Sequence, residues 1–235
     1  MKARAALVVS ATGIERLRTE PPLALRPTPD GVYLVGAAGG PVGGDDLALD
    51  VAVGAGAALA LRGMAATVAL PGRPPAPSRW RLSASVAAGG RLDGRLPPTV
   101  LAAGADHRVT VTASLARGAF LRWREIVVRG RYGEPAGTGT AVLRVTVAGR
   151  PLVHHALSLH PASVGAARVV GMLAVVDPRW VEGTPGGRPL GPQTWWLPAD
   201  GPGGCVVALG DEVEEVDIVL EDQCNHVDFG PDWAS

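Results

Sequence analysis

The chain has 235 residues, with 22 Lys or Arg against 22 Asp or Glu and no net charge. This balance excludes a strong overall attraction to nucleic acid or to an anionic membrane surface. The 32 glycines and 21 prolines stay below the share of a disordered low-complexity chain, so they indicate many turns between short strands. The length suits one domain with a substantial core, and we predict a single domain over residues 1–235.

We expect neither export nor a membrane-spanning segment for this chain. The apolar run at 5–9 is shorter than the core of a signal peptide, and the longest apolar stretch, at 51–61, is interrupted by glycine. We therefore expect a soluble, cytoplasmic protein that binds no membrane. Because the cytosol keeps thiols reduced, Cys205 and Cys224 are expected to be free. Lys2 is the only lysine, which excludes a Walker A nucleotide site.

Alternating patterns predict β-strands along much of the chain. Glycine pairs at 39–44 predict a tight turn that delivers Asp45 to a strand over 47–53. Apolar and polar side chains alternate in three later runs, at 79–86, 109–115 and 141–147. The valine-rich segment 162–176 is also predicted to be a strand. We predict a mostly β fold with few helices, in which short strands stack as in a sandwich or an irregular β-helix.

The segment 177–204 is rich in proline and glycine and shows no sustained period. It is therefore predicted to be a long irregular loop within the domain. Three tryptophans lie in it, at Trp180, Trp195 and Trp196. Exposed aromatic rings can stack on a ligand, so one hypothesis for this chain is a β-rich module that binds a small molecule or a carbohydrate.

Potential metal ligands occur in two segments. His154 and His160 share one face of a predicted strand but lie about 20 Å apart at ~3.3 Å per residue, so they cannot hold one ion. Near the C-terminus, Cys224, His226 and Asp228 would share one face of an extended segment, and these ligand types suit a divalent ion. Acidic residues near a terminus more often form a solvated surface, which is the alternative interpretation. No nucleophile elbow is present, and no catalytic set is recognised.

Charged residues interrupt an apolar run that begins at Phe120. Arg122, Arg124, Glu125 and Arg129 are surrounded by Leu, Trp, Ile and Val. A buried charge requires a partner, because an unpaired one costs several kcal/mol. The run therefore forms either an arginine ladder on a surface or the wall of a polar channel or partner-binding face.

Several short motifs occur in a fixed order between residues 30 and 160. The first is a Gly-Gly-x-x-Gly-Gly-Asp pattern, and a Met-Ala-Ala-Thr segment, a Pro-Thr step and an acidic residue before a Gly-Arg pair follow it. The residues of these motifs are Gly39, Gly40, Gly43, Gly44, Asp45, Thr67, Pro98, Thr99, Glu125, Gly130, Arg131 and Glu134. In this order and spacing the chain resembles the UreD (UreH) family of urease accessory proteins, although Met64 replaces the usual glutamine.

This resemblance implies a mostly β scaffold that is not an enzyme. It implies partners, namely apo-urease, UreF and the nickel-delivering GTPase UreG, and a role in placing nickel in the urease centre. It also implies a polar route for nickel through the protein, with no tightly bound cofactor and nickel present only in transit. A route of this kind needs oxygen or nitrogen ligands that bind the ion weakly. The candidates for the route or for partner binding are Asp45, Asp46, Glu125 and Glu134, with Arg131 as a pairing or gating charge.

Overall fold

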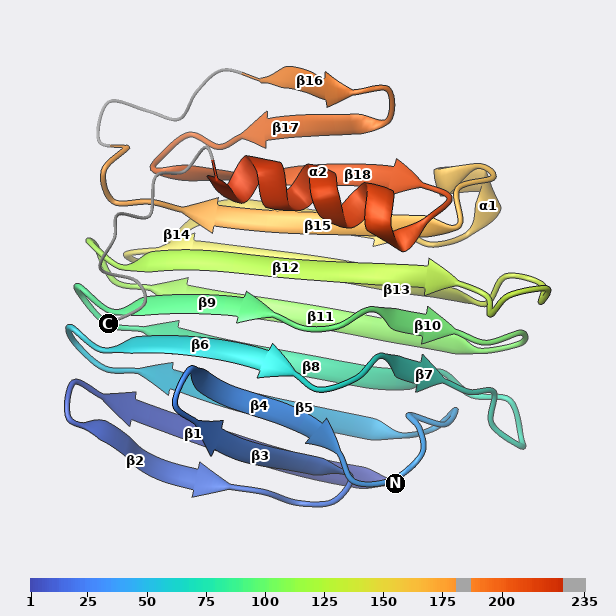
Figure 1. The fold of residues 1–235 in the computed structure, drawn as a ribbon, viewed down its shortest axis with the longest axis horizontal. Helices are drawn as coiled ribbons and strands as arrows, with labels where there is room; N and C mark the ends of the chain where they lie inside the picture. The colour runs from blue at the N-terminus through green and yellow to red at the C-terminus, as the bar shows by residue number, and fades with distance from the viewer. Residues whose placement is uncertain (181–186, 226–235) are drawn as a thin grey trace.

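The computed structural model describes residues 1–180 and 187–225, and in it the chain forms two β-sheets that pack face to face (Figure 1). The mostly β prediction is confirmed, with a β-solenoid of about four turns and two short helices among the described residues. The solenoid resolves the two stacking alternatives in favour of the irregular β-helix.

Sheet A has seven strands in the spatial order β14, β13, β11, β8, β5, β1 and β2. Their bounds are β1 (Lys2–Ser10), β2 (Gly13–Arg18), β5 (Asp46–Val53), β8 (Ser78–Val86), β11 (Asp106–Leu115), β13 (Thr138–Val147) and β14 (Arg150–Ser158).

Sheet B has eleven strands. Nine follow the spatial order β16, β17, β18, β15, β12, β9, β6, β4 and β3; the short strand β10 pairs with β12, and β7 pairs with β10. Their bounds are β3 (Leu23–Thr28), β4 (Gly31–Gly36), β6 (Ala58–Gly63), β7 (Thr67–Ala69), β9 (Arg91–Arg95), β10 (Thr99–Leu101), β12 (Phe120–Arg129), β15 (Val169–Val176), β16 (Arg188–Gly191), β17 (Thr194–Pro198) and β18 (Gly203–Gly210).

The solenoid arises because the chain crosses from sheet A to sheet B and back, so that equivalent strands of successive coils pair in parallel. In sheet A these are β5, β8, β11 and β13, and in sheet B they are β6, β9 and β12. The registers align equivalent inward positions, as in the row of Leu49, Leu82, Val111 and Leu143. A period of two in the sequence thereby becomes continuous apolar rows in space.

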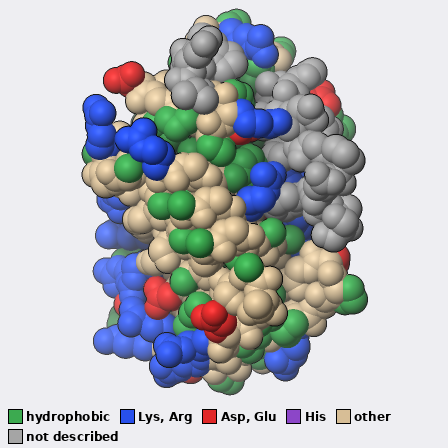
Figure 2. Space-filling model, turned by 90° about the vertical axis from the view of Figure 1, so that its left-hand side faces the viewer, with side chains coloured by type: hydrophobic (Ala, Val, Ile, Leu, Met, Phe, Trp, Pro, Cys, Tyr) green, Lys and Arg blue, Asp and Glu red, His purple; other side chains and the backbone are tan. Residues whose placement is uncertain are grey.

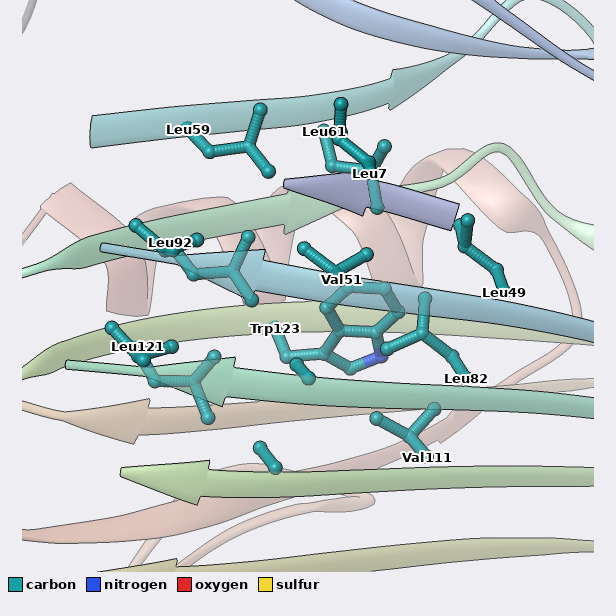
Figure 3. Close-up of a cluster of buried hydrophobic side chains, with 14 of the residues drawn as sticks. Leu7, Leu49, Val51, Leu59, Leu61, Leu82, Leu92, Val111, Leu121 and Trp123 are labelled. Atoms are coloured by element: carbon teal, nitrogen blue, oxygen red, sulfur yellow. The ribbon is translucent and has the colours of Figure 1, made fainter. Parts of the chain in front are cut away.

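The main core lies between the two sheets (Figure 3). Leu49 and Leu82 enter it from sheet A, and Leu61, Leu92 and Leu121 enter it from sheet B; each is at most 1% exposed. Burying one such side chain contributes about 1.5–3 kcal/mol, so the shared core is the main force that joins the sheets.

Trp123 fills the centre of this core. It is 2% exposed and pairs in register with Gly94 on the neighbouring strand β9. A Cβ atom built on Gly94 would lie 2.1 Å from two atoms of the indole ring. The ring therefore lies directly over the glycine backbone, and no larger residue fits at position 94 without moving Trp123.

Two helices lie among the described residues: α1 (Pro161–Val164), and α2 (Val213–Asn225), which packs on the outer face of sheet B over β12, β15 and β18 (Figure 1). Val216 and Leu220, one turn apart, pack over Gly171 of β15, where an added Cβ would lie 2.4 Å from Val216. Glycine at this position lets the helix approach the sheet closely.

Charged groups also attach α2 to sheet B. Arg62, Arg95 and Arg124 are neighbours in register on β6, β9 and β12, so three cations lie in one row. Arg95 donates to both oxygens of Glu221 at 3.0 and 2.9 Å, and Arg124 donates to Glu221 at 3.1 Å and to Asp217. Of the run that begins at Phe120, only Arg124 belongs to this row; Arg122 and Arg129 are 2% and 4% exposed, so the prediction of an arginine ladder on a surface is wrong for them. The acidic side of α2 neutralises part of the row of Arg62, Arg95 and Arg124.

Asp93 neutralises the rest of this row of arginines from within the sheet. Its carboxylate is fully buried and accepts hydrogen bonds from Arg122 at 2.6 Å and from Arg62 at 2.6 Å. Burial alone would raise its pKa, but the bonds from Arg122 and the charges of Arg62 and Arg95 outweigh burial and hold the pKa below its usual value.

Three predictions are corrected by the fold. The segment 177–204 is not one irregular loop, because β16, β17 and the start of β18 lie in it and pair antiparallel with one another. The segment 162–176 is a strand only from Val169, since helix α1 and a turn precede it. Cys224 lies in helix α2 rather than in an extended segment, and His226 and Asp228 lie outside the described residues.

The contact between Trp123 and Gly94 predicts a large effect of a small substitution. Gly94→Ala should destabilise the protein by about 1–3 kcal/mol or more, because the methyl group overlaps the ring. Gly191→Ala is the matched control, since its nearest neighbour would be 4.0 Å away. Chemical denaturation of both variants checks this, and equal stability of the two would contradict the packing described.

Candidate functional site

A cavity of about 90 Å³ lies among residues of both sheets. Apolar side chains such as Leu47 and Trp80 of sheet A and Leu34 of sheet B form much of its lining. Polar groups also reach it, namely Glu125, His107, Thr67 and Thr99. A volume of this size holds a few water molecules, or an ion with part of its hydration shell.

Glu125 is the charged residue in this lining. In β12 the side chains alternate, so Glu125 lies on the inward face together with Trp123 and Val127. It is 8% exposed, and no described residue forms an ion pair or hydrogen bond with its carboxylate. Burial raises the pKa of Glu125 to about 8. The carboxyl group therefore holds its proton at neutral pH and offers oxygen atoms that no side chain occupies.

His107 approaches the cavity from β11 of sheet A. It is 1% exposed, and its Nδ1 atom lies 2.8 Å from the hydroxyl of Ser78. Burial lowers its pKa to about 4, so the imidazole is neutral at physiological pH. A neutral imidazole is a metal ligand, whereas an imidazolium is not. The cavity thus combines a nitrogen ligand type with the carboxyl group of Glu125.

Several residues of the sequence motifs meet at this cavity. Gly40, Thr67 and Thr99 line it with Glu125. Thr67 and Thr99 are neighbours in register on β7 and β10, and the Thr67 amide donates to the Pro98 carbonyl at 3.0 Å. Motifs that are far apart in the sequence therefore build one wall of the same site.

The glycine motif has a structural role beside this wall. Gly40 and Gly44 have φ values of 131° and 90°, which other residues rarely adopt. Gly43 passes so close to Gly72 that an added Cβ would lie 2.5 Å from the Gly72 nitrogen. The geometry explains why glycine stands at these positions; Gly39, by contrast, has open space beside it.

Asp45 closes the turn and does not line the cavity. It is 6% exposed, its carboxylate accepts a hydrogen bond from the Val42 amide at 2.9 Å, and it lies 2.5 Å from the amino group of Met1. The next residue, Asp46, lies on the outer face of sheet A, 2.7 Å from Arg81. The side chains of the adjacent residues Asp45 and Asp46 thus lie in two different places, one at the turn and one on the outer face of sheet A.

Arg131 and Glu134 form a pair of their own in the exposed loop after β12. Arg131 donates to Glu134 at 2.9 Å, and Glu134 also accepts from the Ala103 amide at 3.4 Å. Gly130, which begins this loop, has a φ of 97° and donates to the Leu101 carbonyl at 2.8 Å. None of these residues lines the cavity, so the predicted site residues fall into separate places.

Among residues 1–180 and 187–225, no group of three or more His, Cys, Asp or Glu side chains is arranged to hold a metal ion. Within these residues, the cavity therefore contains no metal site with three such ligands. The hypothesis that the tryptophans form a ligand platform also loses support. Trp196 is 9% exposed and packs edge-to-face against Trp180 at 6.0 Å, so among the three only Trp195 is largely accessible.

His107 and Trp80 were not predicted as site residues. The alternation at Val109, Val111 and Ala113 continues back to His107, which places it on the inward face, and this signal was present in the sequence.

Neither of the helices in the described part of the chain has the length and apolar character needed to cross a membrane.

Comparison with known proteins gives one consistent family. Residues 1–195 match the family model described as UreD urease accessory protein. The chain is 44% identical over 205 residues to the UreD protein of Frankia alni, covering 77% of this chain and 68% of that protein. It is 40% identical to UreD of a Parafrankia species, covering 90% and 84%, and 40% identical to UreD 1 of Saccharopolyspora erythraea, covering 92% and 91%.

The raised pKa of Glu125 predicts a dependence of stability on pH. Between its ordinary pKa of 4.5 and its folded pKa of about 8, the folded protein binds more protons than the unfolded chain. The contribution of Glu125 to the stability of the fold is thus fully present below pH 4.5 and is lost as the pH rises through about 8. Glu125→Gln has no carboxyl group and should not lose this stability. The melting temperature of the variant minus that of the parent should therefore increase from pH 5 to pH 8.5, by about 2–4 °C for each kcal/mol recovered.

Thermal melts across this pH range check the assignment. A constant difference between the two proteins would contradict a carboxyl group that is buried without a partner. Glu15→Gln, at an exposed position, is the control and should follow the parent at every pH.

Proposed function

Because this chain belongs to the UreD family of urease accessory proteins, we propose that it is a scaffold that passes nickel toward the urease active site. The family takes part in urease maturation and is not catalytic. The route we propose leads through the cavity lined by Glu125 and His107.

The observation that carries this proposal is the unpaired carboxyl group of Glu125. The other acidic side chains that are buried in the described part of the chain have partners: Asp93 has arginines, Asp45 has a backbone amide and the amino group of Met1, and Asp177 has Arg179. Leaving a carboxyl group buried without a partner costs stability, so its presence is explained if it binds a cation for part of the time. Nickel is a borderline ion that accepts both imidazole nitrogen and carboxylate oxygen.

Weak and reversible binding suits transfer. Nickel would displace the proton of Glu125, because a carboxylate must be deprotonated to act as a ligand. Each binding event therefore pays the cost of removing a proton from a group with a pKa of about 8. This cost keeps affinity low at neutral pH, and affinity rises as the pH approaches 8.

We propose that the partners are apo-urease, UreF and the GTPase UreG, acting with this chain in the cytoplasm. The chain has no lysine besides Lys2, so it cannot form a Walker A loop, and nucleotide hydrolysis must come from another protein. Asp46 and the pair of Arg131 and Glu134 are at the surface, where they suit partner contacts better than a nickel route. Asp45 supports the turn beside the cavity.

Substitution of Glu125 tests the route. In cells that co-express urease and its accessory proteins, Glu125→Ala should lower the nickel content and activity of purified urease by roughly tenfold, the size of effect seen when groups around a metal site are removed. Glu125→Asp, which keeps the carboxylate, should retain part of the activity. Glu15→Ala is the control.

The level of soluble protein and its recovery with UreF must be measured in the same cells. If Glu125→Ala is soluble, retains its partners and still loads urease fully, the proposed route through this cavity is wrong.

A further inference from the structure

The outer face of sheet A is not covered by any element that the structure describes. Helix α2 lies on sheet B, in front of the view in Figure 1, and sheet A lies behind. The outward positions of its central strands alternate with buried ones, as at Arg79, Ser83 and Ser85 of β8. This surface meets solvent in the isolated chain.

Small side chains make the middle of this face shallow and open. Ala6, Ala52, Ser83, Ser85 and Ser114 line a depression of about 490 Å³ across β1, β5, β8 and β11, and the charged residues Arg16 and Asp50 also line it. Small residues with hydroxyl groups let another surface come close to the sheet and offer hydrogen bonds to it.

Cations outnumber carboxylates on the face. Arg79 and Arg108 are direct neighbours in register. Arg144 lies on the next strand, β13, four residues along from Thr140, which is the neighbour of Arg108. Arg108 is 3.9 Å from Asp106, and no described side chain pairs with Arg79 or Arg144. Figure 2 shows Lys and Arg side chains gathered along its left edge, where the sheet A side is seen in profile.

On sheet B, by comparison, a row of arginines is neutralised by carboxylates of the same chain. On sheet B, the row of Arg62, Arg95 and Arg124 is met by Asp93 and by the acidic side of α2. On sheet A, Arg81 pairs with Asp46 at 2.7 Å and Arg4 pairs with Asp50 at 3.5 Å, whereas Arg79 and Arg144 form no ion pair with the described residues. Arg79 and Arg108 are directly opposite each other on neighbouring strands. Like charges in this arrangement are destabilising, so an external partner with carboxylates would relieve their repulsion.

The size of the face suits a protein partner. Seven strands at about 4.8 Å spacing and about eight residues at ~3.3 Å each give roughly 900 Å². A stable protein interface buries about 800 Å² on each side. Domains that bind nucleic acid are usually basic overall, whereas this chain has a pI near 7.0.

We propose that the outer face of sheet A is a docking surface for an acidic surface of a partner protein. The guanidinium groups of Arg79, Arg108 and Arg144 pair with carboxylates of the partner, which they bind through a planar fork of N–H donors. The serine-lined depression between the strands receives the partner's side chains.

Charge reversal on the face tests the chemistry. Poly-L-glutamate serves as the carboxylate probe, and its binding by the parent should weaken at higher salt. The variant Arg79→Glu/Arg108→Glu/Arg144→Glu should bind it at least tenfold more weakly. The matched control, Arg26→Glu/Arg117→Glu/Arg188→Glu, has the same change of charge at exposed positions off this face and should bind nearly as the parent does.

Two results of this experiment would overturn the proposal. Equal loss in the control variant would show that only the net charge of the chain matters. Tighter binding of double-stranded DNA or of phosphatidylserine vesicles than of poly-L-glutamate would show that the face recognises phosphate.

Thiol labelling locates the face in an assembled complex, and this second test rests on the proposed function. Ser83→Cys and Ser114→Cys, both at exposed positions, should react with a maleimide in the free chain and become protected when the chain is co-purified with urease and its accessory proteins. Thr28→Cys on β3 is the control. Full reactivity of both introduced cysteines within an intact complex would refute the docking face and leave the scaffold proposal standing. Failure to recover any complex would refute the scaffold proposal, and the poly-L-glutamate experiment would then decide on the docking face.

Discussion

The fold depends on the register that stacks equivalent strands of successive coils. Each coil must present its apolar side chains at the same inward positions, because one shift of register would turn a whole row to solvent. Leu82 and Val111 satisfy this condition in sheet A, and Leu92 and Leu121 satisfy it in sheet B. Against such a requirement, a carboxyl group at the inward position of Glu125 is the exception that calls for a functional explanation.

Charge is handled in three ways in this molecule. On sheet B, Arg62, Arg95, Arg122 and Arg124 pair with Asp93 or with the carboxylates of helix α2. Between the sheets, Glu125 has no partner among the described residues and remains protonated at neutral pH. On the outside of sheet A, Arg79 and Arg144 point to solvent. Charges that the chain satisfies itself hold the fold together, and those that it leaves unsatisfied are available to a metal ion or a partner protein.

Much of the fold could be predicted from alternation alone. Strands β8, β11 and β13 have one face in the core and one in solvent, so their sequences show a period of two. Strand β15 is buried on both faces and shows no alternation, which is why its start was misplaced. Helix α2 was not predicted, because its many carboxylates were interpreted as a solvated surface. The spacing of Val216 and Leu220 by one helical turn was the available signal.

The site was only partly accessible from the sequence. Glu125 was found through its motif, since a single glutamate in an apolar run has several interpretations. Asp93 could not be assigned, because it meets Arg62 and Arg122, which lie about 30 residues away in either direction, only through the register of the coils. His107 continues the alternation of β11, but its contact with Ser78 on the neighbouring strand depends on the stacking of the coils. Sequence patterns identify which face a residue takes, whereas the partners across coils depend on the stacking itself.

The central claim is that nickel binds in the cavity at Glu125. The most direct measurement is anomalous X-ray diffraction at the nickel absorption edge, from crystals of the chain soaked in a nickel salt near pH 8.5. We expect an anomalous peak within bonding distance of the Glu125 carboxylate. This peak should be absent from Glu125→Gln crystals soaked in the same way. Nickel found only at surface histidines such as His154, with an empty cavity in both crystals, would contradict the account.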